Sequence, residues 1–111
     1  MTELTAIRCV GCEGGIPAMT KEEVISLMPQ IAEWQLHENG KYITRKFTFK
    51  DFYHTMAFVN AVAWVANQEN HHPDLEVGYN YCHIKFLTHA VNGLTQNDFI
   101  CAAKIDKIAK I

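Results

Sequence analysis

The sequence lacks the features of membrane-spanning, secreted and nucleic-acid-binding proteins. Its longest apolar run is far shorter than the roughly 20 residues that a membrane-spanning helix needs, and residues 1–5 show no basic segment followed by an apolar run, as a secretory signal would. The formal net charge is only −2, with both signs mixed along the chain, so no basic surface for nucleic acid is expected. We therefore expect a cytoplasmic protein that contacts neither a membrane nor nucleic acid directly.

Cysteine is also scarce, with four residues at irregular spacing: Cys9, Cys12, Cys82 and Cys101. This pattern favours free thiols in a reducing compartment over a disulfide framework. Residues 9–12 form a CxxC motif, which is half of a zinc signature, but no second CxxC or HxxxH follows nearby. The simpler interpretation is a pair of incidental thiols in a flexible segment.

A chain of 111 residues with 49% apolar and 20% charged residues has room for one hydrophobic core. Glycines at positions 11, 14 and 15 and Pro17 interrupt the first nineteen residues, which show no hydrophobic periodicity. We therefore predict a flexible N-terminal tail over residues 1–19 and a single domain over residues 20–111.

The first helix and a hairpin are predicted by short local patterns. Thr20 and Glu23 match a capping box, and the helix that they begin should end near Met28 because Pro29 cannot donate to the helical ladder. A two-residue turn at 39–40, with the sequence Asn-Gly, predicts a hairpin. Its register places Arg45 opposite Trp34, and alternate residues then form one apolar face: Trp34, Leu36, Ile43, Phe47 and Phe49.

The second helix should begin at Asp51 and extend to about Asn70. Between residues 56 and 66 only Asn60 is polar, so this helix is apolar nearly all round. A helix on the surface of a monomer would keep a polar half. We therefore expect it to be covered both by the sheet and by a partner chain.

The C-terminal third predicts two more strands and a last helix. Apolar residues alternate over 75–79 and again over 82–86, with Thr88 next in the alternation, and Thr95 with Asp98 matches a second capping box. The order is therefore α-β-β-α-β-β-α. Such an order favours an α+β domain with a four-stranded antiparallel sheet and three helices packed on one face.

The candidate catalytic residues lie at the ends of these elements, where polar groups can face a cleft without disturbing the core. His71 and His72 precede Pro73 at the end of the long helix, His89 follows the fourth strand, and Asp98 begins the last helix. Imidazole is the side chain best suited to exchange protons near neutral pH. The removal of water from a C–O and an N–H bond needs one proton donor and one proton acceptor, and histidines can supply both.

Structural explanations compete with this interpretation. His71 and His72 also suit a polar helix terminus, where a cationic imidazole interacts favourably with the helix dipole, or a metal site. Asp98 occupies a capping position and could be wholly structural. The remaining histidines, at positions 37, 54 and 83, suit exposed polar positions and are assigned no function.

A set of features spread over residues 71–98 resembles the signature of the pterin-4a-carbinolamine dehydratase family. The features are the triplet His71-His72-Pro73, the aromatic Tyr79, His89, the pair Gly93-Leu94, and Asp98. Trp34 and residues 47–52 also look like the first hairpin and helix start of the family. The resemblance covers residues 20 to 110.

The resemblance implies a hydro-lyase that converts 4a-hydroxytetrahydropterin to quinonoid dihydropterin and water, which recycles the cofactor of aromatic amino acid hydroxylases. It implies proton transfer by His71 and His89, binding of the pterin ring by His72, and orientation of an imidazole by Asp98. Tyr79 would help to bind the substrate. No metal and no cofactor beyond the pterin substrate is expected.

One position departs from the family pattern. An acidic residue usually lies four positions before the first histidine, and here that position is Asn67. We expect Asn67 to bind substrate and to orient His71 by a hydrogen bond, without the charge that would stabilise an imidazolium.

The resemblance also implies partners and leaves other functions open. We expect a homodimer or homotetramer joined through helices, with an aromatic amino acid hydroxylase as a possible further partner. The alternative is a binding protein that stabilises a hydroxylase or a transcriptional regulator through its helical face. A third hypothesis is a small metalloprotein that uses His71, His89, Asp98 or the cysteines.

Overall fold

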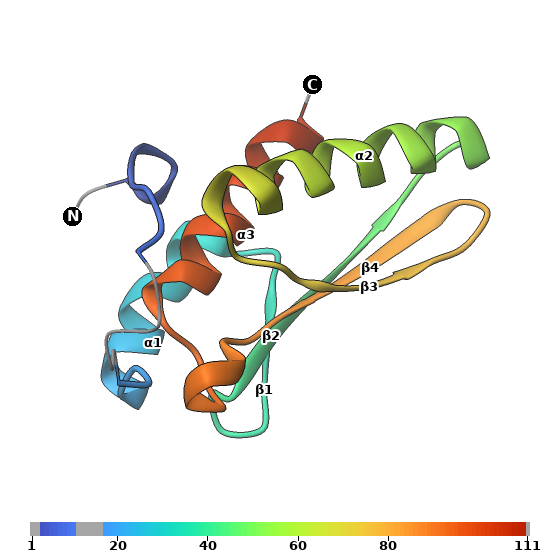
Figure 1. Cartoon of the computed structure of the whole chain (residues 1–111). Helices are drawn as coiled ribbons and strands as arrows, with labels where there is room; N and C mark the ends of the chain where they lie inside the picture. The colour runs from blue at the N-terminus through green and yellow to red at the C-terminus, as the bar shows by residue number, and fades with distance from the viewer. Residues whose placement is uncertain (1–2, 11–16, 111) are drawn as a thin grey trace.

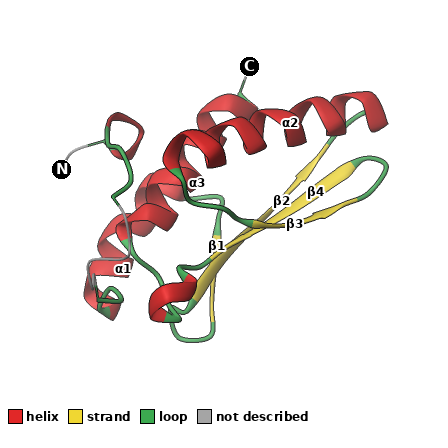
Figure 2. Ribbon diagram, viewed as in Figure 1, coloured by secondary structure: helices red, strands yellow, loops and turns green. Residues whose placement is uncertain are grey.

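Four antiparallel strands form one sheet, and the helices lie on one face of it (Figure 1, Figure 2). The computed structural model describes residues 3–10 and 17–110. The strands follow the order β1-β2-β4-β3 across the sheet, so β1 and β3 form its edges. Their bounds are β1 Gln35–His37, β2 Tyr42–Thr48, β3 Asp74–Val77 and β4 Tyr81–Phe86. This architecture confirms the predicted α+β class.

The helices begin and end close to the residues that the sequence predicted. Their bounds are α1 Lys21–Leu27, α2 Phe52–Glu69 and α3 Gln96–Ala109, with short 3-10 helices η1 Leu4–Ala6, η3 Met28–Ile31 and η4 His89–Val91. The Thr20–Glu23 capping box is present at α1. Asp51 caps α2 by accepting the backbone N–H of His54 at 2.8 Å, and Asn70 ends this helix in the left-handed conformation. None of the described helices is long and apolar enough to cross a membrane.

The first hairpin has the predicted register but a longer loop. Leu36 pairs with Ile43, as expected. However, β1 ends at His37 and β2 begins at Tyr42, so four residues connect them. Three successive residues, from position 38 to Gly40, have positive φ, and the His37 carbonyl accepts the N–H groups of both Gly40 and Lys41. The predicted two-residue turn would pair residue 38 with Lys41. The N–H of Lys41 donates to the His37 carbonyl instead, so that turn does not form.

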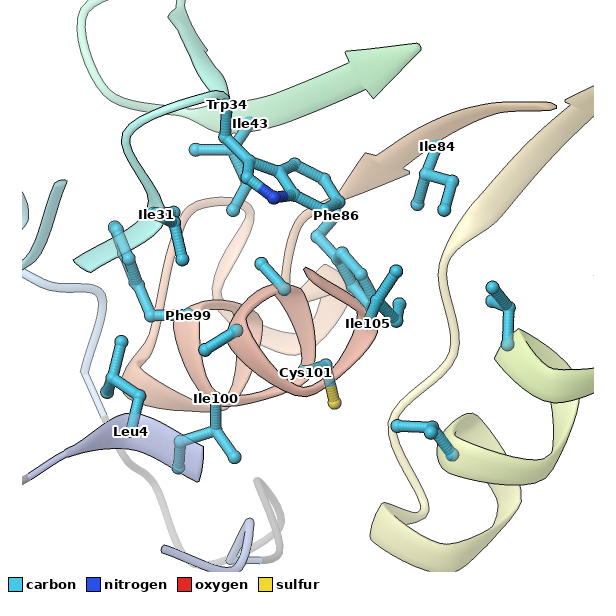
Figure 3. Close-up of a cluster of buried hydrophobic side chains, with 14 of the residues drawn as sticks. Leu4, Ile31, Trp34, Ile43, Ile84, Phe86, Phe99, Ile100, Cys101 and Ile105 are labelled. Atoms are coloured by element: carbon cyan, nitrogen blue, oxygen red, sulfur yellow. The ribbon is translucent and has the colours of Figure 1, made fainter. Parts of the chain in front are cut away.

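The core lies between the inner face of the sheet and the helices (Figure 3). Cys82, Ile84 and Phe86 alternate along β4 and are fully buried. Arg45, the polar exception on the inner face of the first hairpin, pairs with Asp106 of α3 at 2.7 Å, and Asp106 also accepts the indole N–H of Trp34 at 2.8 Å. Burial raises the pKa of Asp106 in spite of these two favourable partners.

Helix α2 is covered on one face only in the single chain. Phe58, Val62 and Val65 are buried within the domain. On the opposite side, Tyr53 is 78% exposed and Trp64 is 66% exposed. The apolar surface that the sequence assigned to a partner therefore exists, but it is centred on Tyr53 and Trp64.

The predicted flexible tail does not fit residues 3–10. Helix η1 packs against α3, and Leu4 lies in the core with 1% of its surface exposed (Figure 3). The backbone N–H of Leu4 donates to the side-chain carbonyl of Gln30 at 3.0 Å. An isolated apolar residue in a short segment gives no periodicity, which is why the sequence pattern missed this contact. Cys12 lies outside the described residues.

The core position of Leu4 leads to a stability prediction. We expect Leu4→Ala to lower the free energy of unfolding by about 3 kcal/mol, because it removes buried methyl groups and leaves a cavity. Leu36→Ala is the matched control, since Leu36 is 37% exposed and should lose clearly less. Urea denaturation of both variants measures the difference. Equal, small losses would show that residues 3–10 do not stabilise the domain.

Candidate active site

His71 and Asp98 form a buried pair between the end of α2 and the start of α3. The Nε2 atom of His71 lies 2.6 Å from Oδ1 of Asp98. Asp98 has no exposed surface, and the side chain of His71 is only 9% exposed. The ring of His71 stacks on Phe86, with 5.8 Å between centroids and 6° between planes. The imidazole is therefore held both at its edge and on its face.

Two threonines complete the hydrogen bonds of the Asp98 carboxylate. Its Oδ2 accepts the Thr88 hydroxyl at 2.8 Å and the backbone N–H of Thr95 at 3.0 Å. The hydroxyls of Thr88 and Thr95 lie 2.8 Å apart. Because Thr88 donates its one hydroxyl hydrogen to Asp98, the Thr95 hydroxyl donates to Thr88. Asp98 is thus a helix cap and the partner of an imidazole at the same time.

This arrangement determines the tautomer of His71. A carboxylate can only accept hydrogen bonds, so the hydrogen between Asp98 and His71 belongs to Nε2. In the neutral ring Nδ1 then keeps a free lone pair. An imidazole whose tautomer is set by a carboxylate in this way can take up a proton at its other nitrogen.

Asn67 lies next to His72, and the structure shows no hydrogen bond from its side chain to His71. Its Oδ1 is 3.4 Å from Nε2 of His72, which is long for a hydrogen bond, and His72 is exposed. The expectation that Asn67 orients His71 is wrong for this geometry. The left-handed residue Asn70 turns the chain at the end of α2, so His71 faces Asp98 and His72 faces back along the helix. A charge placed at residue 67 would therefore act on His72 first.

His89 lies close in sequence to the Asp98 network, whereas Tyr79 lies far from the His71–Asp98 pair. His89 begins η4 and is exposed, and it directly follows Thr88, which donates to Asp98. Tyr79 lies beyond the far end of β3 and stacks on Phe52 at 6.4 Å. The whole of β3 separates it from His71, so the single chain does not bring Tyr79 to the histidines.

Thr88 and Phe86 also belong to the site, although neither was predicted from the sequence. A signal for both was present, because residues 82, 84, 86 and 88 alternate onto the inner face of the sheet, which makes Thr88 a buried polar residue at a strand end. A buried polar side chain needs a hydrogen-bond partner. One hollow in the surface, lined by residues that include Met19 and Leu27, meets this network at Thr95.

A metal centre finds no support in the described part of the chain. Among those residues, no group of three histidine, cysteine, aspartate or glutamate side chains is arranged to hold a metal ion. Cys9 lies near Cys101, and Cys12 of the CxxC motif lies outside the described residues. The site is therefore best described as a carboxylate–imidazole pair with two exposed histidines nearby.

Comparisons with known proteins show the family of the chain. Residues 17–108 match the family model described as pterin 4 alpha carbinolamine dehydratase. A protein of Legionella pneumophila (strain Lens) is 59% identical over 96% of each chain, and one of Nitrosomonas eutropha is 54% identical over 96% of this chain and 93% of its own. Both carry that dehydratase name provisionally. The chain belongs to the pterin-4a-carbinolamine dehydratase family, a family of hydro-lyases.

Two solved structures share the fold. A transcriptional coactivator/pterin dehydratase from Brucella melitensis is 33% identical and aligns with a TM-score of 0.78 over 83% of this chain and 98% of its own. A pterin dehydratase-like protein identified as a RuBisCO assembly factor in the alpha-carboxysome has a TM-score of 0.61 over 69% of this chain and 89% of its own. The second is 22% identical and shows the fold alone.

Proposed function

We propose that the protein dehydrates 4a-hydroxytetrahydropterin to quinonoid dihydropterin and water by histidine acid/base catalysis, and so recycles the cofactor of aromatic amino acid hydroxylases. The observation that carries the proposal is the buried contact of 2.6 Å between His71 and Asp98. Membership of the family supports the reaction class. The cytoplasmic location stays a prediction.

In this proposal His71 is the proton acceptor. Asp98 holds the hydrogen on Nε2, so Nδ1 is the nitrogen that takes the N–H proton of the pterin. As the ring becomes an imidazolium, the carboxylate beside it stabilises the positive charge. The stacking on Phe86 keeps the ring in one orientation, so little reorganisation is needed when the proton moves.

The exposed histidines take the other roles. His89 protonates the leaving hydroxyl, because it lies one residue from Thr88 and thus at the edge of the Asp98 network. His72 holds the pterin ring, with Asn67 beside it. Tyr79 does not enter this mechanism within one chain. A protonated hydroxyl departs as neutral water, so the reaction that we propose needs no metal and no further cofactor.

Single substitutions test these roles. We expect His71→Ala, His89→Ala and Asp98→Asn each to lower kcat by about 100-fold or more, the typical contribution of a positioned acid or base. Asp98→Asn belongs in this set because an amide cannot accept from all three donors, so at least one donor loses its partner. The measurement is a dehydratase assay on chemically generated 4a-hydroxytetrahydropterin, corrected for the spontaneous reaction.

The matched control is His83→Ala, on the outer face of β4 away from the site. It should keep the wild-type rate, and prolonged chelation of the wild type should also change nothing. Wild-type rates in folded His71→Ala and His89→Ala would contradict acid/base catalysis and favour a binding role. A rate that is lost on chelation and restored by zinc would contradict the metal-free proposal.

A second proposal concerns partners. The exposed side chains of Tyr53 and Trp64 on α2 favour an interface, because large aromatic side chains on one helix face are typical of protein contacts. We propose that this face joins copies of the chain into a dimer or tetramer. A stabilising contact with a hydroxylase or a regulator is the alternative use of the same face.

Trp64→Glu tests the interface. A charge buried against an apolar partner is unfavourable, so the variant should dissociate into smaller species while keeping its fold. Light scattering at micromolar concentration measures the mass, and circular dichroism checks the fold. Ile25→Glu is the control, since Ile25 on α1 is also an exposed apolar residue, at 56%. A wild-type protein that is already monomeric would contradict the proposed self-association.

A further inference from the structure

Residues 8–10 lie across the end of α2 and the start of α3. The carboxylate of Glu69, the last residue of α2, accepts the backbone N–H of Cys9 at 2.7 Å. Asn97, in the first turn of α3, accepts the N–H of Val10 at 3.1 Å and donates to the Val10 carbonyl at 2.6 Å. The backbone of Cys9 and Val10 thus forms hydrogen bonds with side chains from both helices.

The side chains that hold this segment are buried. Glu69 is 8% exposed and Asn97 is 3% exposed. Burial acts to raise the pKa of Glu69, but the Cys9 N–H and the ion pairs with Lys104 at 2.8 Å and Arg8 at 3.1 Å outweigh it, so its pKa lies below the usual range. A buried carboxylate and a buried amide both need such partners. Without residues 8–10, Glu69 and Asn97 would lose the backbone partners described above.

Both holding residues are close neighbours of the proposed catalytic pair. Asn97 directly precedes Asp98, and Glu69 lies two residues before His71. His71 is tied to the same helix end, because its backbone N–H donates to the Ala66 carbonyl at 3.1 Å. The contact between His71 and Asp98 joins two separate helices, so its length depends on how these helix ends are held together.

We propose that Glu69 and Asn97 are positioning residues, which use the segment 8–10 as a brace to keep His71 and Asp98 in register. The inference rests on the proposed function of this pair. An acid/base group needs its partner within about half an ångström of the productive position. The brace links the two helix ends that carry the pair through the backbone of Cys9 and Val10.

Asn97→Ala tests the brace. It removes both hydrogen bonds to Val10, so we expect kcat to fall about tenfold with little change in KM, the pattern of a misplaced catalytic group. The neighbouring exposed Gln96→Ala is the matched control and should keep the wild-type kcat. The second measurement is the Nε2–H resonance of His71 in nitrogen–proton correlation spectra, which should broaden by faster exchange with water in Asn97→Ala alone.

The two measurements separate this inference from the proposed function. If the wild type shows no dehydratase activity but the His71 resonance broadens in Asn97→Ala, the function is wrong and the brace stands. If Asn97→Ala changes neither kcat nor the resonance, the brace is overturned. Should Asn97→Ala fail to fold, Val10→Pro removes the Val10 N–H that donates to Asn97 and changes no residue of either helix, and the same two outcomes apply.

A second inference comes from the sulfur atoms in the same place. Cys9 Sγ lies 3.7 Å from Sγ of Cys101 on α3. Cys101 is fully buried, whereas Cys9 is partly exposed. The hydrogen bond with Cys9, together with burial, raises the pKa of the Cys101 thiol. Cys9 is therefore the sulfur that an oxidant in solution meets first.

We propose that Cys9 and Cys101 form a reversible disulfide in response to a peroxide. The Cys9 thiolate attacks a peroxide oxygen, the O–O bond breaks, and Cys9 becomes a sulfenic acid as hydroxide leaves. The Cys101 sulfur then attacks Cys9, the S–O bond breaks, and its thiol proton leaves in the second water. Two thiols and one hydrogen peroxide give one disulfide and two waters, and a dithiol reductant reverses the reaction.

Treatment of the wild type with equimolar hydrogen peroxide tests the disulfide. We expect the loss of two hydrogens by mass spectrometry, a cross-linked peptide pair that joins Cys9 to Cys101, and a higher urea midpoint for the oxidised protein, because the new bond closes a long loop. Cys101→Ser should abolish all three changes, and Cys12→Ser should leave them intact. A cross-link from Cys9 to Cys12, or oxidation without any cross-link, would overturn the inference.

Discussion

The site depends on one buried charge, the carboxylate of Asp98. A carboxylate without exposed surface is very unfavourable unless it is fully hydrogen-bonded. Here the donors come from three parts of the fold: His71 after α2, Thr88 after β4, and Thr95 before α3. Because each donor is needed, the carboxylate holds the ends of these elements together. The hydrogen bonds that stabilise the buried carboxylate therefore also fix the position of His71, the proposed proton acceptor.

Glu69, at the end of α2, depends on hydrogen bonds and ion pairs in the same way. It is the second buried carboxylate of the region, and its donors are the backbone of Cys9 and the cations of Lys104 and Arg8. The first carboxylate joins helix ends to a strand, and the second joins them to the N-terminal segment. That segment adds Leu4 to the core on the opposite side of α3 from the sheet. A stretch without periodicity can therefore be a structural part of the domain.

Local rules predicted most of the fold, and long-range contacts account for what they missed. The caps at Thr20 and Asp51 and the register of Leu36 with Ile43 depend on residues close in sequence, and all three were predicted correctly. The contacts of Leu4 and Cys9 join residues far apart in the chain, which periodicity cannot detect. In the site, the positions of His71 and Asp98 at element ends were enough to select them as candidates. The contact of Asn67 with His72 could not be predicted in this way, because the left-handed turn at Asn70 changes the direction of the next two side chains.

Helix α2 connects the two surfaces on which the proposed functions depend. Its outer face carries Tyr53 and Trp64, and its last turn carries Glu69 immediately before the turn to His71. A helix transmits displacement along its length because its backbone hydrogen bonds are continuous. Whatever covers Trp64 would therefore also limit the movement of the helix end that positions His71. A partner bound to the outer face of α2 would therefore also affect the active site, since it would restrict the helix whose end positions His71, the proposed proton acceptor.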